Sequence, residues 1–417
     1  MERSRKRRWA AVGAGLVLWM AIAQSVGAAA DDTAAPLSPA SAITDVAAAS
    51  TEGGQAPVQI SSPSAILMEA STGQVIFEKN AHERRNPASI TKIMTLIVAF
   101  DAIRDGKVKL EDKVTISEEA ASQVGTIIFA DEGETFTLGE LLQSVAVGSA
   151  NDAAVAVAEH VAGSVQAFVQ AMNEKAKELG MKDTEFKNPT GLSAEGHLTS
   201  AYDIALMGRY AALNYPELIK LTSIYEADLQ VPWRRNGPVF KLWNNNKLLT
   251  WYQGADGLKT GWTEAAGYCL AATAQRNGVR MISVVMGADT WKRRNAEAAK
   301  LLDYGFANYT AVELAAKDQP VGKIPVERGK ALKVEVIPQR AFTVGALKGQ
   351  QDKLQSELRL PKSVEAPIAA GQVLGEMVAT LDGKEVARMP LVAAQEVPRA
   401  TMWESLVLQI KGLFSHK

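Results

Sequence analysis

A serine and a lysine three residues apart are the first residues of this chain that could do chemistry. Ser89 precedes Lys92 by three positions, and no other serine of the 417 residues has a lysine at that distance. Pro87 favours the first turn of a helix here, and residues at i and i+3 of a helix share a face. A lysine whose pKa is lowered by burial and by neighbouring cations can take the proton of a serine hydroxyl and make it a nucleophile. Taken alone, the pattern is more typical of a capped helix with a solvated lysine.

Two further short motifs complete the pattern. Ser149 and Asn151 form Ser-x-Asn after an apolar run over residues 141–147, and Lys-Thr-Gly at residues 259–261 opens an apolar strand. Each of these motifs carries little information by itself. In the order Ser-x-x-Lys, Ser-x-Asn, Lys-Thr-Gly, they match the signature of penicillin-binding proteins and class A β-lactamases.

The chain resembles the low-molecular-mass penicillin-binding proteins that are D-alanyl-D-alanine carboxypeptidases, the serine peptidases that trim peptidoglycan stem peptides. Residues 86–92 are similar to the nucleophile segment of that family and residues 257–261 to its strand motif. Residues 188–192 and 199–203 are similar to stretches that the family carries between its second and third motifs. The resemblance implies an α+β fold with a β-lactamase/transpeptidase-like catalytic domain, in which an antiparallel sheet has flanking helices and a helical subdomain. A small all-β domain and a terminal amphipathic helix would follow it.

The resemblance also implies a role for each motif residue. Ser89 would be the acylated nucleophile, Lys92 the base that activates it, and Ser149 the relay that carries a proton to the leaving amine. The oxyanion hole would consist of the backbone N–H groups of Ser89 and Trp262. The substrate-binding residues would be Asn151 for a backbone amide, Lys259, Thr260 and Arg294 for a terminal carboxylate, and Gly261 and Trp262 beside them. Arg293 adjoins Arg294, so this last assignment could shift by one residue. The resemblance implies no cofactor and no metal.

The implied activity is removal of the terminal D-alanine from peptidoglycan stem pentapeptides through an acyl-enzyme on Ser89, which β-lactams would inhibit by acylating the same serine. A DD-endopeptidase acting on cross-bridges uses the same residues, but the carboxylate site at Lys259 and Arg294 favours the carboxypeptidase. A β-lactamase is less favoured, because the second motif is Ser-Ala-Asn rather than Ser-Asp-Asn. In addition, no glutamate between Asn151 and Lys259 has an asparagine four residues later. A non-catalytic envelope scaffold would leave the nucleophile, base and relay unexplained.

Strands at both ends of one domain are expected to hold these motifs. Residues 65–68 and 74–77 predict a hairpin, and residues 267–274 and 280–287 predict two apolar strands. Between them, apolar residues at helical spacing start at Ile93 and predict a mostly helical region. Together these elements predict one mixed α/β domain whose sheet joins its two ends.

Composition divides the chain into five segments. Residues 1–30 have the basic, apolar and small-residue order of a secretory signal peptide, and residues 31–62 have the Ala, Ser, Thr, Pro and Gly content of a flexible tether. We expect the catalytic domain over residues 63–315. Short alternating segments, with a hairpin turn at Asp382-Gly383, predict a small β-sandwich-like domain over residues 316–397. Residues 398–417 predict an amphipathic helix.

That last helix favours a membrane location. Trp403 and Phe414 lie on one apolar helical stripe, with Lys411 and Lys417 beside it. Such a helix could dock on the β domain, but Trp and Phe on its apolar face favour the membrane interface. We therefore expect an exported protein that is peripheral on the outer face of the cytoplasmic membrane, towards the periplasm or cell wall. Its expected partners are the membrane surface, peptidoglycan stem peptides and β-lactams.

Charge and residue content exclude other classes of function. Lys and Arg number 45 against 46 Asp and Glu, which gives no basic field for nucleic acid. A single cysteine, Cys269, excludes an intramolecular disulfide and, with only four histidines, a Cys/His zinc cluster; we expect it to be buried. His82, His160 and His197 lack an evident acidic partner in the sequence, so we expect structural or surface histidines rather than a catalytic triad. Asp203, near His197, is expected to be solvated.

Overall fold

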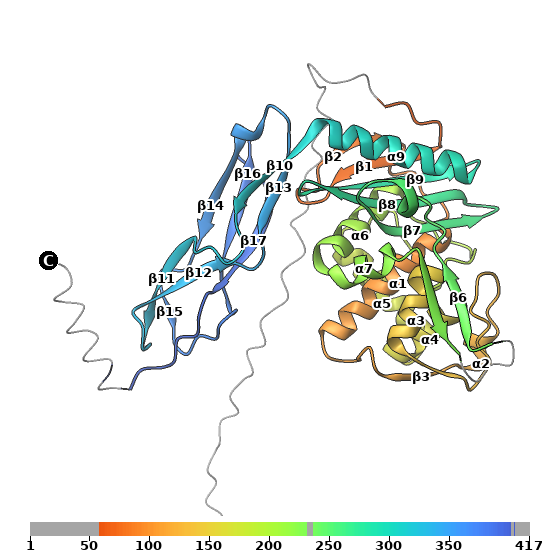
Figure 1. Cartoon of the computed structure of the whole chain (residues 1–417), viewed down its shortest axis with the longest axis horizontal. Coiled ribbons are helices and arrows are strands. Elements are labelled where there is room, and N and C mark those ends of the chain that lie inside the picture. The colour runs from red at the N-terminus through yellow and green to blue at the C-terminus, as the bar shows by residue number, and fades with distance from the viewer. Residues whose placement is uncertain (1–57, 232–236, 402–403, 405–417) are drawn as a thin grey trace, which may run out of the picture. The chain divides into compact units, whose positions relative to one another are not determined.

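The computed structural model describes residues 58–231, 237–401 and 404 (Figure 1). Its first part is built on a five-stranded antiparallel sheet in the order β2-β1-β9-β8-β7. The strands are β1 (Ser64–Glu69), β2 (Val75–Lys79), β7 (Ala255–Thr263), β8 (Gly267–Arg276) and β9 (Val279–Ala288). Ile66 of β1 lies opposite Val284 of β9, so one sheet joins the two ends of the domain as predicted. The predicted hairpin of β1 and β2 is also confirmed.

Helices cover both faces of this sheet, which explains its long apolar strands. Ile66 and Met68 of β1 face a core that includes α6 (Ala201–Asn214), whereas Ala65 and Leu67 face a second core that includes α9 (Trp291–Asn308). Figure 1 shows α9 running along one side of the sheet and α6 lying on the other. The sheet therefore forms the middle layer of this part of the chain.

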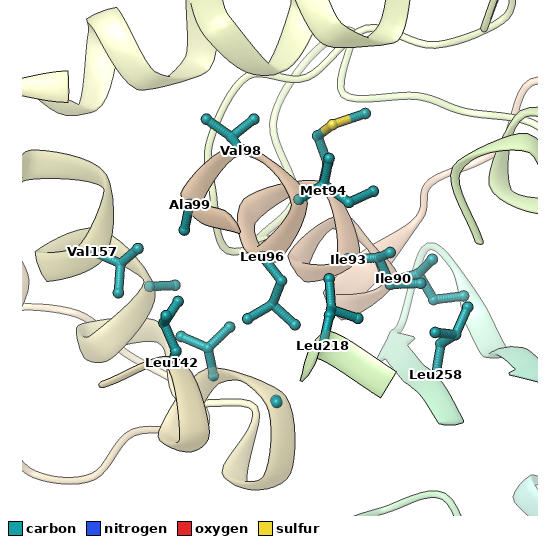
Figure 2. Close-up of a cluster of buried hydrophobic side chains, with 14 of the residues drawn as sticks. Ile90, Ile93, Met94, Leu96, Val98, Ala99, Leu142, Val157, Leu218 and Leu258 are labelled. Carbon is teal, nitrogen blue, oxygen red and sulfur yellow. The ribbon is translucent and has the colours of Figure 1, made fainter. Parts of the chain in front are cut away.

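The helix α1 (Lys92–Arg104) lies at the centre of the helical region. It follows a 3₁₀ turn, η1 (Ala88–Thr91), and is buried at every position from Lys92 to Phe100, which confirms the predicted helix. In Figure 2, Leu96 projects toward Leu142 and Leu218 of neighbouring helices within the same apolar cluster. A helix that is apolar all round belongs in a protein core, so α1 is a rigid support for the residues at its start.

The remaining helices and two short hairpins complete the first part of the chain. The helices are α2 (Glu118–Ala121), α3 (Leu138–Gln143), the π-helical turn η2 (Ser144–Gly148), α4 (Asn151–Ala162), α5 (Val165–Glu178), α7 (Pro216–Ser223) and α8 (Leu248–Trp251). The hairpins pair β3 (Lys113–Thr115) with β4 (Thr135–Thr137) and β5 (Glu226–Gln230) with β6 (Val239–Trp243).

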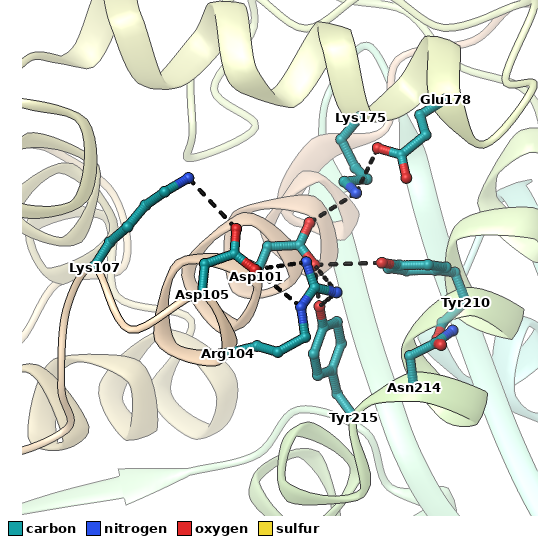
Figure 3. Close-up of polar contacts among 9 residues, drawn as sticks. All are labelled: Asp101, Arg104, Asp105, Lys107, Lys175, Glu178, Tyr210, Asn214 and Tyr215. Carbon is teal, nitrogen blue, oxygen red and sulfur yellow. Dashed lines mark hydrogen bonds and ion pairs between the residues drawn. The ribbon is translucent and has the colours of Figure 1, made fainter. Parts of the chain in front are cut away.

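A polar cluster fixes the C-terminal end of α1 (Figure 3). Asp101 accepts a hydrogen bond from the hydroxyl of Tyr215 and one from Tyr210, at 3.3 Å, and its carboxylate lies 2.8 Å from Lys175 Nζ and 3.2 Å from Arg104 Nη1. Burial and the neighbouring carboxylate raise the pKa of the Tyr215 hydroxyl, which keeps it protonated as a donor. The cluster ties α1 to α5, α6 and the start of α7, at the end opposite Lys92.

The second part of the chain is all β, as predicted. Its main sheet has the order β14-β16-β17-β12-β11-β15, and β10 pairs with β13 in a separate ribbon. The strands are β10 (Tyr309–Ala315), β11 (Gly322–Glu327), β12 (Lys333–Pro338), β13 (Phe342–Leu347), β14 (Leu354–Arg359), β15 (Val364–Glu365), β16 (Val373–Leu381) and β17 (Lys384–Ala393), with a 3₁₀ turn at Gln351–Lys353. Asp382 and Gly383 both have positive φ between β16 and β17, as a tight hairpin turn requires. β10 precedes the boundary expected near residue 316 yet pairs with a strand beyond it.

Some sequence predictions lie outside the described residues. These are the signal peptide over residues 1–30, the tether up to residue 57 and nearly all of the amphipathic helix after residue 401. Among the helices of the described part of the chain, none is both long enough and apolar enough to cross a bilayer.

Candidate active site

Ser89 and Lys92 meet as their spacing predicts. Ser89 lies in the turn η1, and the Nζ atom of Lys92, the first residue of α1, lies 3.2 Å from the Ser89 Oγ atom. Ala88, directly before the serine, has a φ of 48°, a conformation that L-residues adopt only when the surrounding structure fixes it. The start of the central helix therefore presents a hydroxyl to an amine in a fixed geometry.

Lys92 is held by three different segments. Its side chain has no exposed surface, and Nζ also lies 2.7 Å from Asn151 Oδ1 and 2.6 Å from the Thr190 carbonyl oxygen. Asn151 starts α4, while Thr190 belongs to the loop between α5 and α6. A neutral amine keeps two N–H groups for these two acceptors and can direct its lone pair at the serine hydroxyl.

Burial and charge prepare Lys92 to act as a base. Burial lowers its pKa well below the ordinary value for lysine, and the positive charge of Lys259 lowers it further, while Asp152 acts in the opposite direction. A depressed lysine pKa is the property that lets this side chain accept a proton from serine near neutral pH. The arrangement can thus generate a serine alkoxide equivalent without a histidine.

Ser149 occupies a special backbone position. It follows the π-helical turn η2 and has φ 61° and ψ 28°, in the left-handed region. Such turns are rare and often mark functional sites. The prediction from the apolar run over residues 141–147 contained no such break in the helix. The break turns the chain so that Asn151, two residues later, reaches Lys92.

Asn151 and Asp152 anchor this second motif to the preceding loop. The Asn151 side chain donates to the Val124 carbonyl at 2.6 Å, and its backbone N–H donates to Thr126 at 2.7 Å. The Asp152 carboxylate accepts the backbone N–H groups of Ile128, at 2.9 Å, and Ala130, at 3.2 Å. Burial raises the pKa of Asp152. No role was predicted for Asp152 from the sequence, where the available signal was an acidic residue directly after the motif asparagine.

The third motif lies inside β7, not at its start. The sequence predicts that Lys-Thr-Gly opens a strand, but β7 begins at Ala255, four residues before Lys259, because the polar and glycine-containing residues there also pair with β8. Gly261 faces the nucleophile segment, since a Cβ atom at this position would lie 2.7 Å from the Pro87 oxygen and 3.2 Å from the Ser89 nitrogen. Any larger residue would push β7 away from Ser89, so the two backbones meet only because position 261 is glycine.

Lys259 and Arg294 bring two buried positive charges to the same side of the site. Burial and the charge of Arg294 lower the pKa of Lys259 to about 7, and burial lowers the pKa of Arg294 to about 10. No carboxylate of the described residues is among the groups that shift either pKa. Buried cations without an acidic partner are costly, and an incoming carboxylate would compensate them.

The other predicted substrate-binding residues lie on β7 and in the first turn of α9. Thr260 is buried between Lys259 and Gly261 on β7. The Trp262 side chain is 59% exposed, and its ring lies 6.0 Å from that of Tyr268 on the neighbouring strand β8. Arg294 is buried in the first turn of α9, whereas the side chain of its neighbour Arg293 is 48% exposed and pairs with Asp289. The buried residue of the pair is therefore the one beside Lys259.

The loop that supplies Thr190 includes residues 188–192, which resemble the family in sequence and for which no catalytic role was predicted. Asn188 Oδ1 accepts hydrogen bonds from the backbone N–H groups of Thr190 and Gly191, at 3.1 and 2.7 Å, which shapes the turn. Gly191 has φ 84°, and a Cβ atom there would lie 1.9 Å from the Ala88 oxygen. This loop therefore packs directly against the nucleophile turn, which only a left-handed glycine allows.

Of the three histidines expected to be structural or on the surface, two have acidic partners that the sequence did not reveal. His82 Nδ1 lies 2.9 Å from Asp183, and His160 Nε2 lies 3.3 Å from Asp112. Buried His197 accepts the Lys187 N–H at Nδ1 and contacts Thr91 Oγ1 at 2.8 Å through Nε2, and burial, with the charge of Lys187, lowers its pKa to about 4.

Asp203 and Cys269 are both buried side chains. Asp203 was expected to be solvated but is buried in α6, where it accepts hydrogen bonds from Thr184 and the Asp183 N–H, and burial raises its pKa to about 6. Cys269 is buried as expected. In the part of the chain that the structure describes, no three His, Cys, Asp or Glu side chains converge as a metal site requires.

Comparisons with known proteins agree with this geometry. Residues 50–290 match the family model described as D-alanyl-D-alanine carboxypeptidase, and residues 309–399 match that of the penicillin-binding protein 5 C-terminal domain. The chain is 43% identical to D-alanyl-D-alanine carboxypeptidase DacF of Bacillus subtilis (strain 168), over 81% of this chain and 86% of that protein.

Solved structures extend the likeness. Penicillin binding protein 5 from Haemophilus influenzae is similar with a TM-score of 0.63 and 34% identity, over 83% of this chain and all of that one. Penicillin-Binding Protein D2 from Listeria monocytogenes, solved in its ampicillin-bound form, is similar with a TM-score of 0.51 and 30% identity, over 60% of this chain and all of that one.

The contact between Gly191 and Ala88 leads to the first prediction. Gly191→Ala should lower the rate of Ser89 acylation by a fluorescent penicillin about 100-fold, because displacement of the nucleophile turn by even 1 Å removes productive alignment. Gly196→Ala is the matched control, since Gly196 has a similar φ of 78° but its Cβ would meet side chains alone, the flexible Lys187 at 3.1 Å and Glu185 Oε2 at 3.9 Å. Equal acylation rates in the two variants would contradict the proposed support.

Proposed function

This chain belongs to the D-alanyl-D-alanine carboxypeptidase family of serine peptidases, and on that premise we propose that it removes the terminal D-alanine from peptidoglycan stem pentapeptides. β-Lactams would inhibit it by acylating the same serine. The observation that carries the proposal is the buried amine of Lys92 at 3.2 Å from Ser89 Oγ, with the buried cations Lys259 and Arg294 nearby.

The reaction begins with attack of Ser89 on the carbonyl between the two terminal D-alanines. Lys92 takes the hydroxyl proton as the serine oxygen bonds to the carbonyl carbon, and the carbonyl oxygen becomes an oxyanion. The backbone N–H groups of Ser89 and Trp262 stabilise that oxyanion, a role supported by the close approach of Gly261 to the Ser89 nitrogen. Ser149 relays a proton to the leaving amine, the C–N bond breaks and D-alanine departs. Water then attacks the acyl-enzyme and restores the free serine.

The substrate is recognised by its charged end. Lys259, Thr260 and Arg294 bind the terminal carboxylate, and Asn151 holds a substrate backbone amide. The absence of an acidic partner beside Lys259 and Arg294 among the described residues supports this role, because the substrate then supplies the missing negative charge. A cross-bridge cleaved by an endopeptidase need not end in a carboxylate at this position, so the two cations favour the carboxypeptidase.

β-Lactams are expected to be inhibitors rather than substrates. Rapid hydrolysis in class A β-lactamases uses a glutamate-bound water. Between Asn151 and Lys259, no glutamate of this sequence is followed four residues later by an asparagine. We therefore expect a long-lived acyl-enzyme. A purely structural role in the envelope is less favoured, because it gives no reason for a fully buried lysine beside Ser89.

We further infer that the protein is exported and peripheral on the outer face of the cytoplasmic membrane. The proposal rests on the sequence of residues 1–30, which has the order of a signal peptide, and on the apolar stripe of residues 398–417.

The central test is D-alanine release from a synthetic pentapeptide that ends in D-Ala-D-Ala. The purified protein should release D-alanine, and Ser89→Ala should abolish both release and labelling by a fluorescent penicillin, because the nucleophile is gone. Labelling without release would contradict the carboxypeptidase and point to cross-linked peptides as substrates. If Ser89→Ala still releases D-alanine and is still labelled by the penicillin, Ser89 is not the nucleophile.

The two cations predict a pH effect. Lys259 must be protonated to bind a carboxylate, so kcat/KM should fall as the pH rises through its pKa. Arg294→Ala removes a charge that lowers this pKa, so the alkaline limb should move to higher pH. The maximum of kcat/KM should fall about 10- to 150-fold, because a charge-assisted hydrogen bond worth about 1.5–3 kcal/mol is lost.

Arg293→Ala is the control for this measurement, since Arg293 is exposed and pairs with Asp289. Its pH profile should match that of the unmodified protein. A shift in Arg293→Ala instead of Arg294→Ala would move the assignment to the neighbouring arginine.

The membrane proposal has its own test. Deletion of residues 400–417 should release most of the protein into the soluble fraction of fractionated cells, because the apolar stripe that enters the interface is lost. Penicillin labelling of the released protein checks that the catalytic domain is intact. Unchanged membrane association would refute the anchor.

A further inference from the structure

The strand β6 presents two different faces. Phe240 and Leu242 point inward, with Leu242 only 2% exposed, whereas Val239, Lys241 and Trp243 alternate with them on the exposed face. The inward residues pair across the hairpin with Leu229 and Ala227 of β5. Both inward side chains meet segments that hold the Ser149 and Asn151 motif.

Leu242 packs on the turn that ends at Ser149. A Cβ atom added at Gly148, the last residue of η2, would lie 2.8 Å from Leu242 Cδ2. Gly148 directly precedes Ser149, whose left-handed φ of 61° costs about 1–2 kcal/mol for an L-residue unless its neighbours hold it. Leu242 is thus in contact with the residue whose position sets the direction of the Ser149 backbone.

Phe240 packs on the loop that holds Asn151. Its ring lies 6.1 Å from that of Phe129, in an edge arrangement. Phe129 stands between Ile128 and Ala130, whose N–H groups bind the Asp152 carboxylate. Phe240 therefore contacts, through Phe129, the loop whose backbone N–H groups anchor Asp152, next to Asn151.

The same strand leads to the third motif. After β6, the Asn246 side chain donates to the Gly257 carbonyl of β7 at 2.9 Å, and the Asn245 carbonyl lies 3.5 Å from Arg294 Nη2. One continuous segment, residues 239–246, thus contacts the supports of Ser149 and of Asn151, the strand of Lys259, and Arg294.

We propose that Leu242 and Phe240 are positioning residues for the Ser149 and Asn151 motif: through Gly148, Leu242 holds the Ser149 hydroxyl where it can pass a proton to the leaving group, and through Phe129, Phe240 supports the loop that anchors Asn151. The inference deepens the proposed function and rests on it. A relay displaced by a fraction of an ångström still allows substrate to bind, so the loss should appear in kcat rather than in KM.

Reciprocal changes of size at the contact provide the test. Leu242→Ala should lower kcat for D-alanine release about tenfold and change KM by less than about twofold. Gly148→Ala should also lower kcat, because its new methyl group would displace Leu242. In the double variant that methyl group enters the space that Leu242 leaves, so kcat should recover to at least about threefold above that of Leu242→Ala. Phe240→Leu should lower kcat/KM with a rise in KM, because the loop that Phe240 contacts anchors Asn151, which holds a substrate backbone amide.

Two controls separate positioning from general destabilisation. Leu302→Ala removes an equally buried leucine from the separate core beside α9 and should lower the melting temperature comparably while leaving kcat unchanged. Trp243→Ala changes the exposed face of the same strand and should leave kcat unchanged. If Leu242→Ala is too unstable to purify, Leu242→Val gives a smaller truncation with the same expected direction.

The kcat values of the variants distinguish a positioning role of Leu242 from a loss of stability alone. Additive losses in the double variant, or a kcat in Leu242→Ala equal to that of Leu302→Ala, would overturn the positioning role. If the unmodified protein binds penicillin but releases no D-alanine, the proposed function fails, and the rate of penicillin acylation becomes the readout. A tenfold loss of that rate in Leu242→Ala with recovery in the double variant would still support the positioning role, and an unchanged rate would overturn it.

Discussion

A lysine that is wholly buried, and whose three hydrogen-bond partners are all neutral, is the constraint on which this site depends. Lys92 can be accommodated only if a serine hydroxyl, an asparagine side chain and a backbone carbonyl converge on one nitrogen atom. Those partners come from a 3₁₀ turn, the start of α4 and a loop after α5. The position of the Lys92 amine therefore depends on how these three segments pack together. Removing water from that amine favours its uncharged form, which is the form that can accept a proton.

A row of positive charges extends from this amine. Lys259 depresses the pKa of Lys92, and Arg294 depresses that of Lys259. The described residues place no acid between Lys259 and Arg294 to relieve their repulsion, which is electrostatically unfavourable and which an anionic peptide terminus would reduce. If Lys259 binds the substrate carboxylate as proposed, substrate binding and base activation would be linked, because a carboxylate that neutralises Lys259 would also change the field at Lys92.

The sequence predicted most of what depends on short spacing and missed side-chain partners that lie far apart in the chain. The Ser89 and Lys92 pair, the helix α1, the hairpin of β1 and β2 and the turn at Asp382 follow from local pattern. The Thr190 carbonyl stands 98 positions from Lys92, and Asp183 stands 101 positions from His82, so neither partner has a local signal. The π-helical turn before Ser149 was missed because its residues continue an apolar helical pattern. Lys-Thr-Gly was placed at the start of β7 because the polar residues before it resemble a loop.

The order of strands in the sheet has a consequence for how the protein is made. β1 is among the first strands to be synthesised, yet its neighbour β9 ends at Ala288, after every motif of the site. A nascent chain that lacks β9 leaves one edge of β1 unpaired, and pairings between residues so far apart in sequence form slowly. The sheet beside Ser89 is thus completed only when nearly the whole domain has been synthesised, and partly synthesised chains expose a strand edge that is prone to aggregate.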